Sequence, residues 1–148
     1  MQRMDEPLEP RSIRVLLAED DYLYAQALTL ALENDDRIEI VGHAGDGVEA
    51  FVLCAALEPD VVVMDLFMPR MDGAEATARI REALPRTRVV ALTSSRSPDD
   101  TRILRAAGAD ASVAKDAVAT DLTDLVRAIV RAAVIVRPVS IPAQLAAV

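Results

Sequence analysis

Short apolar runs alternate along the chain with longer segments that space their apolar residues at helical intervals. The runs are rich in β-branched and aliphatic residues and are too short for helices, so they predict buried strands. They lie at residues 13–18, 38–41, 61–64, 88–92 and 111–114. The helices are predicted at residues 21–33, 48–57, 74–83, 97–107 and 118–133. This repeated alternation indicates an α/β fold, in which a parallel sheet carries helices on both faces.

Capping and turn residues support the ends of the early elements. Asn34 is a stop signal for the first helix, in which apolar residues recur at helical spacing. Those residues are Leu23, Ala27, Leu30 and Ala31. Gly42 closes the second predicted strand, and Asp46 can cap the helix that follows it. The run at 61–64 is apolar on both faces, as expected of a central parallel strand.

The later boundaries follow the same logic. Pro69 and Gly73 bracket the loop after the third strand. Pro98 stands in the first turn of the fourth helix, where proline is tolerated, and Gly108 ends that helix. The last helix has an apolar stripe made of Leu122, Leu125, Val126, Ile129, Val130 and Ala133.

The length of the chain suits one domain with less ordered ends. The sequence has 148 residues, and a single domain commonly has this size. Residues 1–11 are polar and contain two prolines, so they predict a flexible leader. Residues 12–133 hold all the predicted elements, and residues 134–148 form a tail or the start of a linker.

Composition limits the core and the partners. Hydrophobic residues make up 52% of the chain and aromatic residues only 3%, so the core must be aliphatic. The net charge of −8 argues against direct nucleic-acid binding, which needs a surplus of Lys and Arg. The single cysteine, Cys54, excludes an internal disulfide and is expected in the core. Without a signal peptide or an apolar run of roughly 18–20 residues, the protein is expected to be cytoplasmic, with no membrane partner.

Polar side chains gather where the predicted strands end. Because the carboxyl ends of parallel strands lie at one edge of a sheet, these side chains are expected to converge where the strand order reverses. They are Glu19 and Asp20 after the first strand, Asp65 after the third, Thr93 and Ser94 after the fourth, and Lys115 after the fifth.

These residue types suit phosphoryl chemistry at a carboxylate. Carboxylates that meet without a cation repel one another, and Mg²⁺ relieves this while using only one or two of them as ligands. Asp65 can then accept a phosphoryl group as an aspartyl-phosphate. Lys115 would neutralise the transferring group, and Thr93 would donate a hydroxyl hydrogen bond to it.

The segments around these residues resemble the receiver domain of two-component response regulators. They are Val15–Asp21, Pro59–Gly73, Val89–Ser94 and Gly108–Asp116. Each segment is weak evidence alone, but together, in order and in register over roughly residues 12–133, they are highly specific. The stretch Ile40–Ala50 and the ending Lys115–Asp116 are similar to the NarL/FixJ class, which usually carries a C-terminal LuxR-type helix-turn-helix.

The resemblance implies a fold, a cofactor and a partner. The fold would be a doubly wound, flavodoxin-like, five-stranded parallel sheet of order 2-1-3-4-5 with five helices. A sensor histidine kinase would phosphorylate Asp65, and Thr93 and Lys115 would contact the phosphoryl oxygens. The implied Mg²⁺ ligands are Glu19, Asp20, Asp65 and the backbone carbonyl of Phe67. The domain would form a homodimer, either through residues 101–107 and the fifth strand or through the first and last helices.

Two features depart from the family pattern. Ser112 stands where the family usually has an aromatic residue that moves together with Thr93, so signal output is expected to be weakened or rewired. Residues 134–148 hold no helix-turn-helix, so the chain is interpreted as an excised receiver or a single-domain regulator. Any control of transcription would act through a DNA-binding domain that these residues do not contain.

Some polar residues have simpler interpretations. Asp21 is expected to cap a helix, and Asp72 is expected in a turn. His43 has no histidine partner in the sequence, so a surface or strand-end role is favoured over a ligand role.

Three functions compete at this point. The first is a phosphoacceptor switch that catalyses its own phosphorylation and dephosphorylation and is not otherwise an enzyme. The second is a phosphorylation-independent dimerisation or interaction module. The third, a phosphatase or mutase, is disfavoured because Leu66 and Phe67 stand just after Asp65, where a second acid would be needed.

Overall fold

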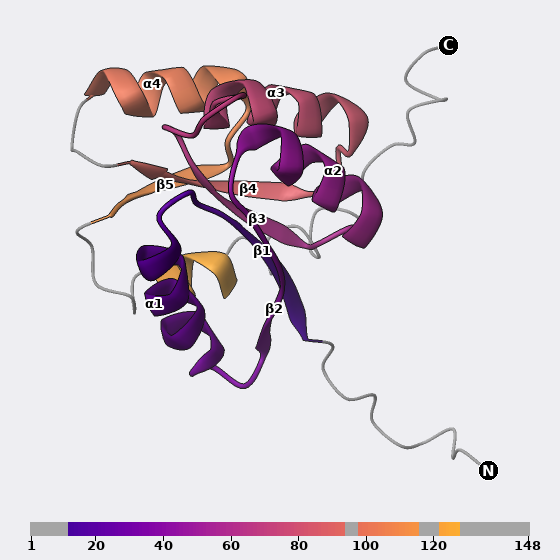
Figure 1. Ribbon diagram of the computed structural model, residues 1–148, viewed down its shortest axis with the longest axis vertical. Helices are drawn as coiled ribbons and strands as arrows, with labels where there is room; N and C mark the ends of the chain where they lie inside the picture. The colour runs from indigo at the N-terminus through magenta and orange to yellow at the C-terminus, as the bar shows by residue number, and fades with distance from the viewer. Residues whose placement is uncertain (1–11, 94–97, 116–121, 128–148) are drawn as a thin grey trace.

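Five parallel strands form one sheet in the computed structural model, which describes residues 12–93, 98–115 and 122–127 (Figure 1). The strands are β1 (Ile13–Ala18), β2 (Ile38–Ala44), β3 (Val61–Asp65), β4 (Arg88–Thr93) and β5 (Ala111–Ala114). Their order across the sheet is β2-β1-β3-β4-β5, and every neighbouring pair is parallel. This is the doubly wound, flavodoxin-like order that the resemblance implied.

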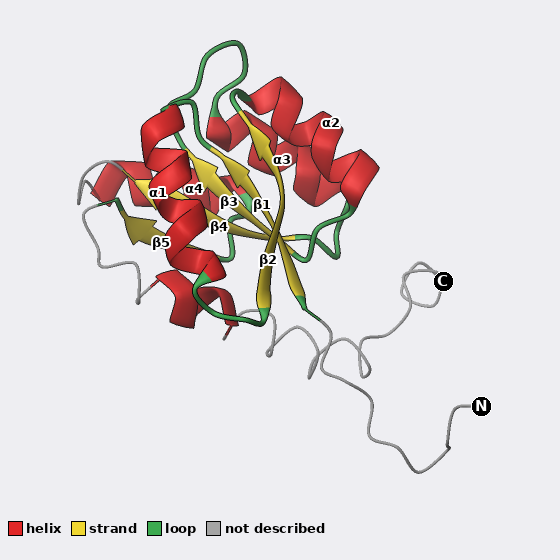
Figure 2. Cartoon of the chain, turned by 60° about the horizontal axis from the view of Figure 1, so that its bottom comes forward, coloured by secondary structure: helices red, strands yellow, loops and turns green. Residues whose placement is uncertain are grey.

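Helices cover both faces of this sheet (Figures 1 and 2). They are α1 (Tyr22–Glu33), α2 (Gly47–Leu57), α3 (Gly73–Ala83), α4 (Pro98–Ala107) and a helical segment at 122–127. The segment 122–127 lies with α1 on one face, and α2, α3 and α4 lie on the other. No helix in these described ranges is long and apolar enough to cross a membrane.

Alternating side chains of the central strands divide the core into two layers. In β3, Val61 and Val63 pack with α1 and the segment 122–127, whereas Val62 and Met64 pack with α2 and α3. Successive side chains of a strand point to opposite faces, so a strand that is covered on both sides must be apolar throughout. All five residues of β3 are buried, and Asp65 at its end is the only one of them that is not apolar.

Helix α1 buries a different set of residues from the set whose spacing predicted it. Its buried residues are Ala25, Leu28 and Leu32, while Leu23 is 79% exposed and Leu30 is 75% exposed. Apolar residues occur on more than one side of this helix, so spacing alone does not identify the face that packs on the sheet.

The predicted end of the second strand at Gly42 is wrong. β2 continues to Ala44, and the register with β1 shifts so that Ile40 pairs with Val15 and Gly42 pairs with Leu16. The extra residue is typical of a β-bulge, which lets a strand continue with a local kink. The extension carries the backbone of His43 to the edge of the sheet where the predicted site lies.

The other predicted boundaries agree within about one residue, except in the last helix. That helix was predicted at 118–133, and the structure describes residues 122–127 as helical. The remainder of the prediction lies outside the described residues, as do the predicted leader 1–11 and tail 134–148. Cys54 is fully buried, which confirms its predicted place in the core.

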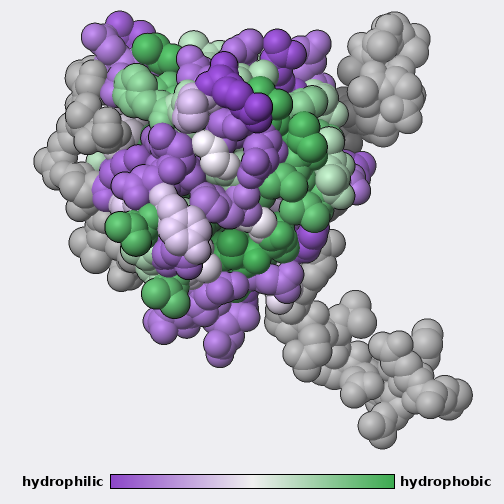
Figure 3. All heavy atoms as spheres, viewed as in Figure 1, coloured by the Kyte–Doolittle hydropathy of each residue, from purple (hydrophilic) through white to green (hydrophobic). Residues whose placement is uncertain are grey.

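Helix α2 presents apolar side chains to solvent as well as to the core. Glu49 is its only charged residue, and Val48 and Val52 are 37% and 56% exposed. Figure 3 shows apolar residues gathered over this helix.

Candidate functional site

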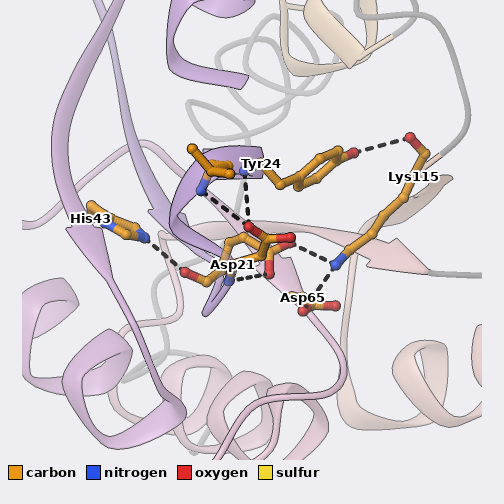
Figure 4. Close-up of polar contacts among 7 residues, drawn as sticks. Asp21, Tyr24, His43, Asp65 and Lys115 are labelled. Carbon is orange, nitrogen blue, oxygen red and sulfur yellow. Dashed lines mark hydrogen bonds and ion pairs between the residues drawn. The ribbon is translucent and has the colours of Figure 1, made fainter. Parts of the chain in front are cut away.

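Three predicted residues, Glu19, Asp65 and Lys115, come together at the carboxyl end of the sheet (Figure 4). β1 and β3 are neighbours at the point where the strand order reverses, which is where open α/β sheets form their ligand sites. Glu19 follows β1 and is 1% exposed, and Asp65 ends β3 and is 2% exposed. Buried carboxylates need cationic or hydrogen-bonding partners, so this depth already indicates a specialised site.

Lys115 supplies one cation to both carboxylates. Its Nζ lies 2.7 Å from Oε1 of Glu19 and 3.2 Å from Oδ2 of Asp65. Burial lowers the pKa of Lys115, but the contacts with Glu19 and Asp65 outweigh burial and raise its pKa above the ordinary value. The lysine is therefore charged at neutral pH and holds the two carboxylates in place.

A single lysine leaves this group of three acids with two negative charges that no described cation compensates. Oxygen atoms of Glu19, Asp20 and Asp65 lie within 4.8 Å of one another. Asp20 is exposed, but the partial loss of its contact with water raises its pKa, and a hydrogen bond and repulsion from Glu19 raise that pKa further. Oδ1 of Asp65 is buried and accepts no hydrogen bond from any residue that the structure describes. Three carboxylates with one buried oxygen unpartnered match the hard oxygen ligands of Mg²⁺.

Local hydrogen bonds orient Glu19. The backbone N–H of Asp21 donates to Oε2 of Glu19 at 3.0 Å. The Asp21 side chain accepts from the backbone N–H groups of Leu23 and Tyr24, so Asp21 is the N-cap of α1, as predicted. The start of α1 and the carboxylate of Glu19 are thus held by the same residue.

Strand β2 contributes more than the sequence indicated. Nε2 of His43 lies 2.7 Å from the backbone carbonyl oxygen of Glu19, so this ring nitrogen carries the proton if the contact is a hydrogen bond. His43 also lies beside the exposed Tyr22, with the two ring centroids 6.3 Å apart. The strand-end role predicted for His43 is consistent with this position, but its contact with the acidic loop was missed.

Tyr24 is the second residue that sequence reasoning did not assign to the site. Its hydroxyl donates to the backbone carbonyl of Lys115 at 3.1 Å, and Nζ of Lys115 lies 5.0 Å from its ring centroid (Figure 4). Only tertiary structure joins residues that are 91 positions apart. The sequence carries one clue to this contact, because Lys115 is the only lysine of the chain and lysine side chains pack on aromatic rings.

The remaining predicted residues occupy different positions. Thr93 ends β4 and is 3% exposed, and its backbone carbonyl accepts a hydrogen bond from the backbone N–H of Lys115 at 2.7 Å. Phe67 follows β3, and its side chain is 59% exposed. Ser112 is half-buried on β5, where it pairs with Ala91 and borders a cavity of about 10 Å³. Ser94 lies outside the described residues.

Two neighbouring turns shape the edge of the site. Asp72 was predicted in a turn and is the N-cap of α3, accepting from the backbone N–H of Glu75 at 2.8 Å. Asp46 caps α2 as predicted, and Arg70 contacts its Oδ2 at 2.9 Å. A separate surface hollow of about 900 Å³ involves Arg14 and lies near the amino-terminal ends of β1 and β4, so it is not part of this site.

The chain matches known proteins over most of its length. The model of the response regulator receiver domain matches residues 15–127. The transcriptional regulatory protein LiaR of Bacillus subtilis is 39% identical over 116 residues, which are 78% of this chain and 55% of that protein. The response regulator protein VraR of Staphylococcus aureus is 37% identical over 118 residues, with 78% of this chain and 56% of VraR covered. The chain therefore spans about half the length of these relatives.

Solved structures agree with the family match. The receiver domain of the response regulator NarL from Mycobacterium tuberculosis has a TM-score of 0.79 and 30% identity, covering 82% of this chain and 98% of that one. The site geometry, the strand order, the family match over residues 15–127 and the NarL-like and LiaR-like relatives lead to one assignment. This chain belongs to the response regulator receiver family, is the receiver domain of a two-component response regulator, and falls in its NarL/FixJ-like class.

Proposed function

We propose that Asp65 accepts a phosphoryl group in a Mg²⁺-dependent reaction and that the domain thereby switches between two signalling states. The single observation that carries this proposal is the environment of the Asp65 carboxylate. One of its oxygens contacts Lys115 at 3.2 Å, and the other is buried without a hydrogen-bond donor among the described residues. A buried, oriented carboxylate with one unpartnered oxygen suits a nucleophile better than a structural ion pair.

The transfer itself is a displacement at phosphorus. A carboxylate oxygen of Asp65 forms the new O–P bond while the N–P bond of a phosphohistidine breaks, and the leaving imidazole then takes a proton from solvent. Water later attacks the same phosphorus, releases inorganic phosphate and restores the carboxylate. Both steps use groups of the domain itself, so we class it as self-catalysing rather than as an enzyme with a separate substrate.

Glu19, Asp20 and Asp65 are the side chains that would hold Mg²⁺, with the backbone carbonyl of Phe67 as the further proposed ligand. When bound, the metal would neutralise charge on the phosphoryl oxygens. Lys115, whose Nζ lies 3.2 Å from Oδ2 of Asp65, is the fixed cation proposed to contact the phosphoryl oxygens. Thr93 is proposed to donate its hydroxyl to a phosphoryl oxygen and to move during switching.

The partners follow from the relatives and remain proposals for this chain. We propose a sensor histidine kinase as the phosphoryl donor in the cytoplasm and a homodimer as the signalling species. LiaR is a transcriptional regulatory protein, and the chain spans about half of its length. Control of transcription is therefore proposed to act through a DNA-binding domain, with no direct nucleic-acid contact from these residues. The domain boundaries 12–133, with a leader before and a tail after, are proposed on the same basis.

A second function is favoured by one specific feature. Ser112 is half-buried, and the cavity beside it has only about 10 Å³, roughly the space of one water molecule. The aromatic ring that the family usually carries at this position is absent. If switching depends on such a ring, the domain would act as a phosphorylation-independent dimerisation module.

The deciding measurement is the intact mass after incubation with acetyl phosphate and Mg²⁺. The wild type should gain one phosphoryl group, and Asp65→Asn should gain none. Asp99→Asn is the matched control, because Asp99 is an exposed carboxylate on α4 and should not alter labelling. Size-exclusion elution of the labelled protein separates the two functions. A shift supports the switch, and labelling without a shift supports the interaction module. A wild type that binds Mg²⁺ but gains no mass would rule out the acceptor role.

A further inference from the structure

Four residues at the site form a closed chain of contacts (Figure 4). The N–H of Asp21 donates to Glu19, and Asp21 in turn accepts from the N–H of Tyr24 at 3.2 Å. The hydroxyl of Tyr24 donates to the carbonyl of Lys115, whose Nζ returns to Glu19 at 2.7 Å. Three of these residues lie together at the start of α1, so Tyr24 is the member that links the helix to the end of β5.

The backbone of Lys115 is held from two sides. Its N–H donates to the carbonyl of Thr93 on the neighbouring strand at 2.7 Å. Its carbonyl accepts from the hydroxyl of Tyr24 at 3.1 Å. β5 ends at Ala114, and Lys115 keeps one inter-strand bond through its N–H while its carbonyl is held by Tyr24, so these two bonds fix where its side chain begins.

The side chain of Lys115 is guided by the same tyrosine. Nζ lies 5.0 Å from the centroid of the Tyr24 ring, within the range of a cation–π contact. A lysine side chain has four rotatable bonds and would otherwise lose much of its conformational freedom to hold one position. The Tyr24 ring beside the Lys115 side chain and the Tyr24 hydroxyl on the Lys115 carbonyl restrict that freedom already in the unphosphorylated domain.

We propose that Tyr24 is a positioning residue that places the ammonium group of Lys115 against Asp65. Its consequence for phosphoryl transfer rests on the proposed acceptor function, whereas the placement of Lys115 does not. Because Tyr24 lies on α1, any partner that shifts the first turns of this helix also shifts Lys115. The residue therefore connects the surface of α1 to the chemistry of the site.

Tyr22 provides a matched control on the same helix. It is 64% exposed, and its ring lies beside His43 rather than Lys115. Tyr24 is half-buried and its body packs on the core layer of α1. Tyr24→Phe keeps the ring and removes the hydroxyl, and Tyr24→Leu keeps apolar packing while removing both contacts. The same two substitutions at Tyr22 change neither contact.

The placement can be measured without any phosphoryl donor or metal. Lys115 is the only lysine, so protein labelled with ¹³C-lysine gives one set of lysine NMR signals. We expect Tyr24→Leu to move the ε-CH₂ signal toward the position of a free lysine, as the ring current is lost. Tyr24→Phe should keep most of the ring shift but move the signal of the Lys115 carbonyl carbon, which loses the hydrogen bond from the hydroxyl. An unchanged ε-CH₂ signal in Tyr24→Leu would overturn the proposal.

The consequence for function is a graded change in labelling by acetyl phosphate. A cation–π contact and one hydrogen bond together predict labelling about three- to tenfold slower in Tyr24→Leu. Tyr24→Phe should be intermediate, and both Tyr22 variants should match the wild type. Equal rates in Tyr24→Leu and Tyr22→Leu would overturn the functional part. A wild type that takes no label contradicts the acceptor function instead, and the NMR comparison still decides the role of Tyr24.

Discussion

The ammonium group of Lys115 lies 2.7 Å from Oε1 of Glu19, a carboxylate that we assign to the metal. Glu19 is 1% exposed, so its charge is compensated inside the protein rather than by water. The lysine thus compensates charge in the metal-free state at the place where a cation is expected to bind. Mg²⁺ and Lys115 are expected to share this carboxylate, and the balance between them determines how tightly the metal is held.

Removing the lysine should destabilise the metal-free domain and tighten Mg²⁺ binding. In Lys115→Met, the buried carboxylates of Glu19 and Asp65 lose their only described cation and repel each other. We expect a loss of about 1–3 kcal/mol in the free energy of unfolding, less than for a fully buried pair because Lys115 keeps 23% side-chain exposure. Mg²⁺ should restore most of this loss.

Urea unfolding with and without Mg²⁺, together with calorimetric titration of the metal, measures both effects. Arg102→Met is the matched control, since that arginine forms an exposed ion pair with Asp99 and should change stability by no more than about 0.5 kcal/mol. Weaker Mg²⁺ binding in Lys115→Met than in the wild type would contradict the competition between the two cations.

Gly73 is expected to tolerate no side chain, because the backbone of Asp65 lies against it. A Cβ at position 73 would lie 1.9 Å from the carbonyl oxygen of Asp65 and 2.9 Å from Cα of Leu66. Gly73→Ala should therefore displace the acceptor strand, destabilise the domain by on the order of 2–3 kcal/mol and slow phosphorylation. Thermal unfolding and intact-mass labelling measure the two effects. At Gly45 a Cβ would meet nothing within 4 Å, so Gly45→Ala is the control and should match the wild type.

Cys54 should be unreactive in the folded domain and should make stability fall at high pH. Burial raises the pKa of its thiol from the ordinary 9.0 to about 12. The unfolded chain therefore loses this proton at lower pH than the folded one. The contribution to stability is fully present below pH 9 and is lost as the pH rises from there toward about 12. A chromogenic disulfide reagent at pH 8 should modify the thiol in denaturant but not in native buffer. Rapid modification of the native protein would contradict this burial.

The cap of α2 should lose its stabilising effect in acid. The hydrogen bond from the backbone N–H of Glu49 lowers the pKa of Asp46, and the charge of Arg70 lowers it further. A carboxyl group with a lowered pKa stabilises the fold above the unfolded value of 3.8 and loses that contribution as the pH falls through its folded pKa. Asp46→Asn keeps a capping oxygen, so its difference in stability from the wild type should be larger at pH 7 than at pH 2. Urea unfolding at both pH values tests this, and an equal difference at both would contradict it.

The order of the elements and the edge that carries the site followed from the sequence alone. Apolar runs such as Val61–Met64 can only be strands covered on both faces, and parallel strands must place Glu19, Asp65 and Lys115 at one edge. Caps such as Asp21 and Asp46 were readable for the same reason, since a short polar side chain before a helix satisfies local N–H groups. This information lies in the chemistry of neighbouring residues and in the repeat of apolar residues, every two positions in strands and every 3.6 in helices.

Only the tertiary structure decided which side chains meet across the sheet. Spacing along α1 did not show that Leu28 is buried and Leu30 exposed, because both are apolar and the sheet selects the face. The bulge that extends β2 past Gly42 was invisible, since it depends on the register with β1. The contact between Tyr24 and Lys115 joins residues 91 positions apart, and no local pattern encodes a distance of that kind. The sequence therefore determined the chemistry available at the site, and packing of α1 on the sheet determined how its one lysine is placed.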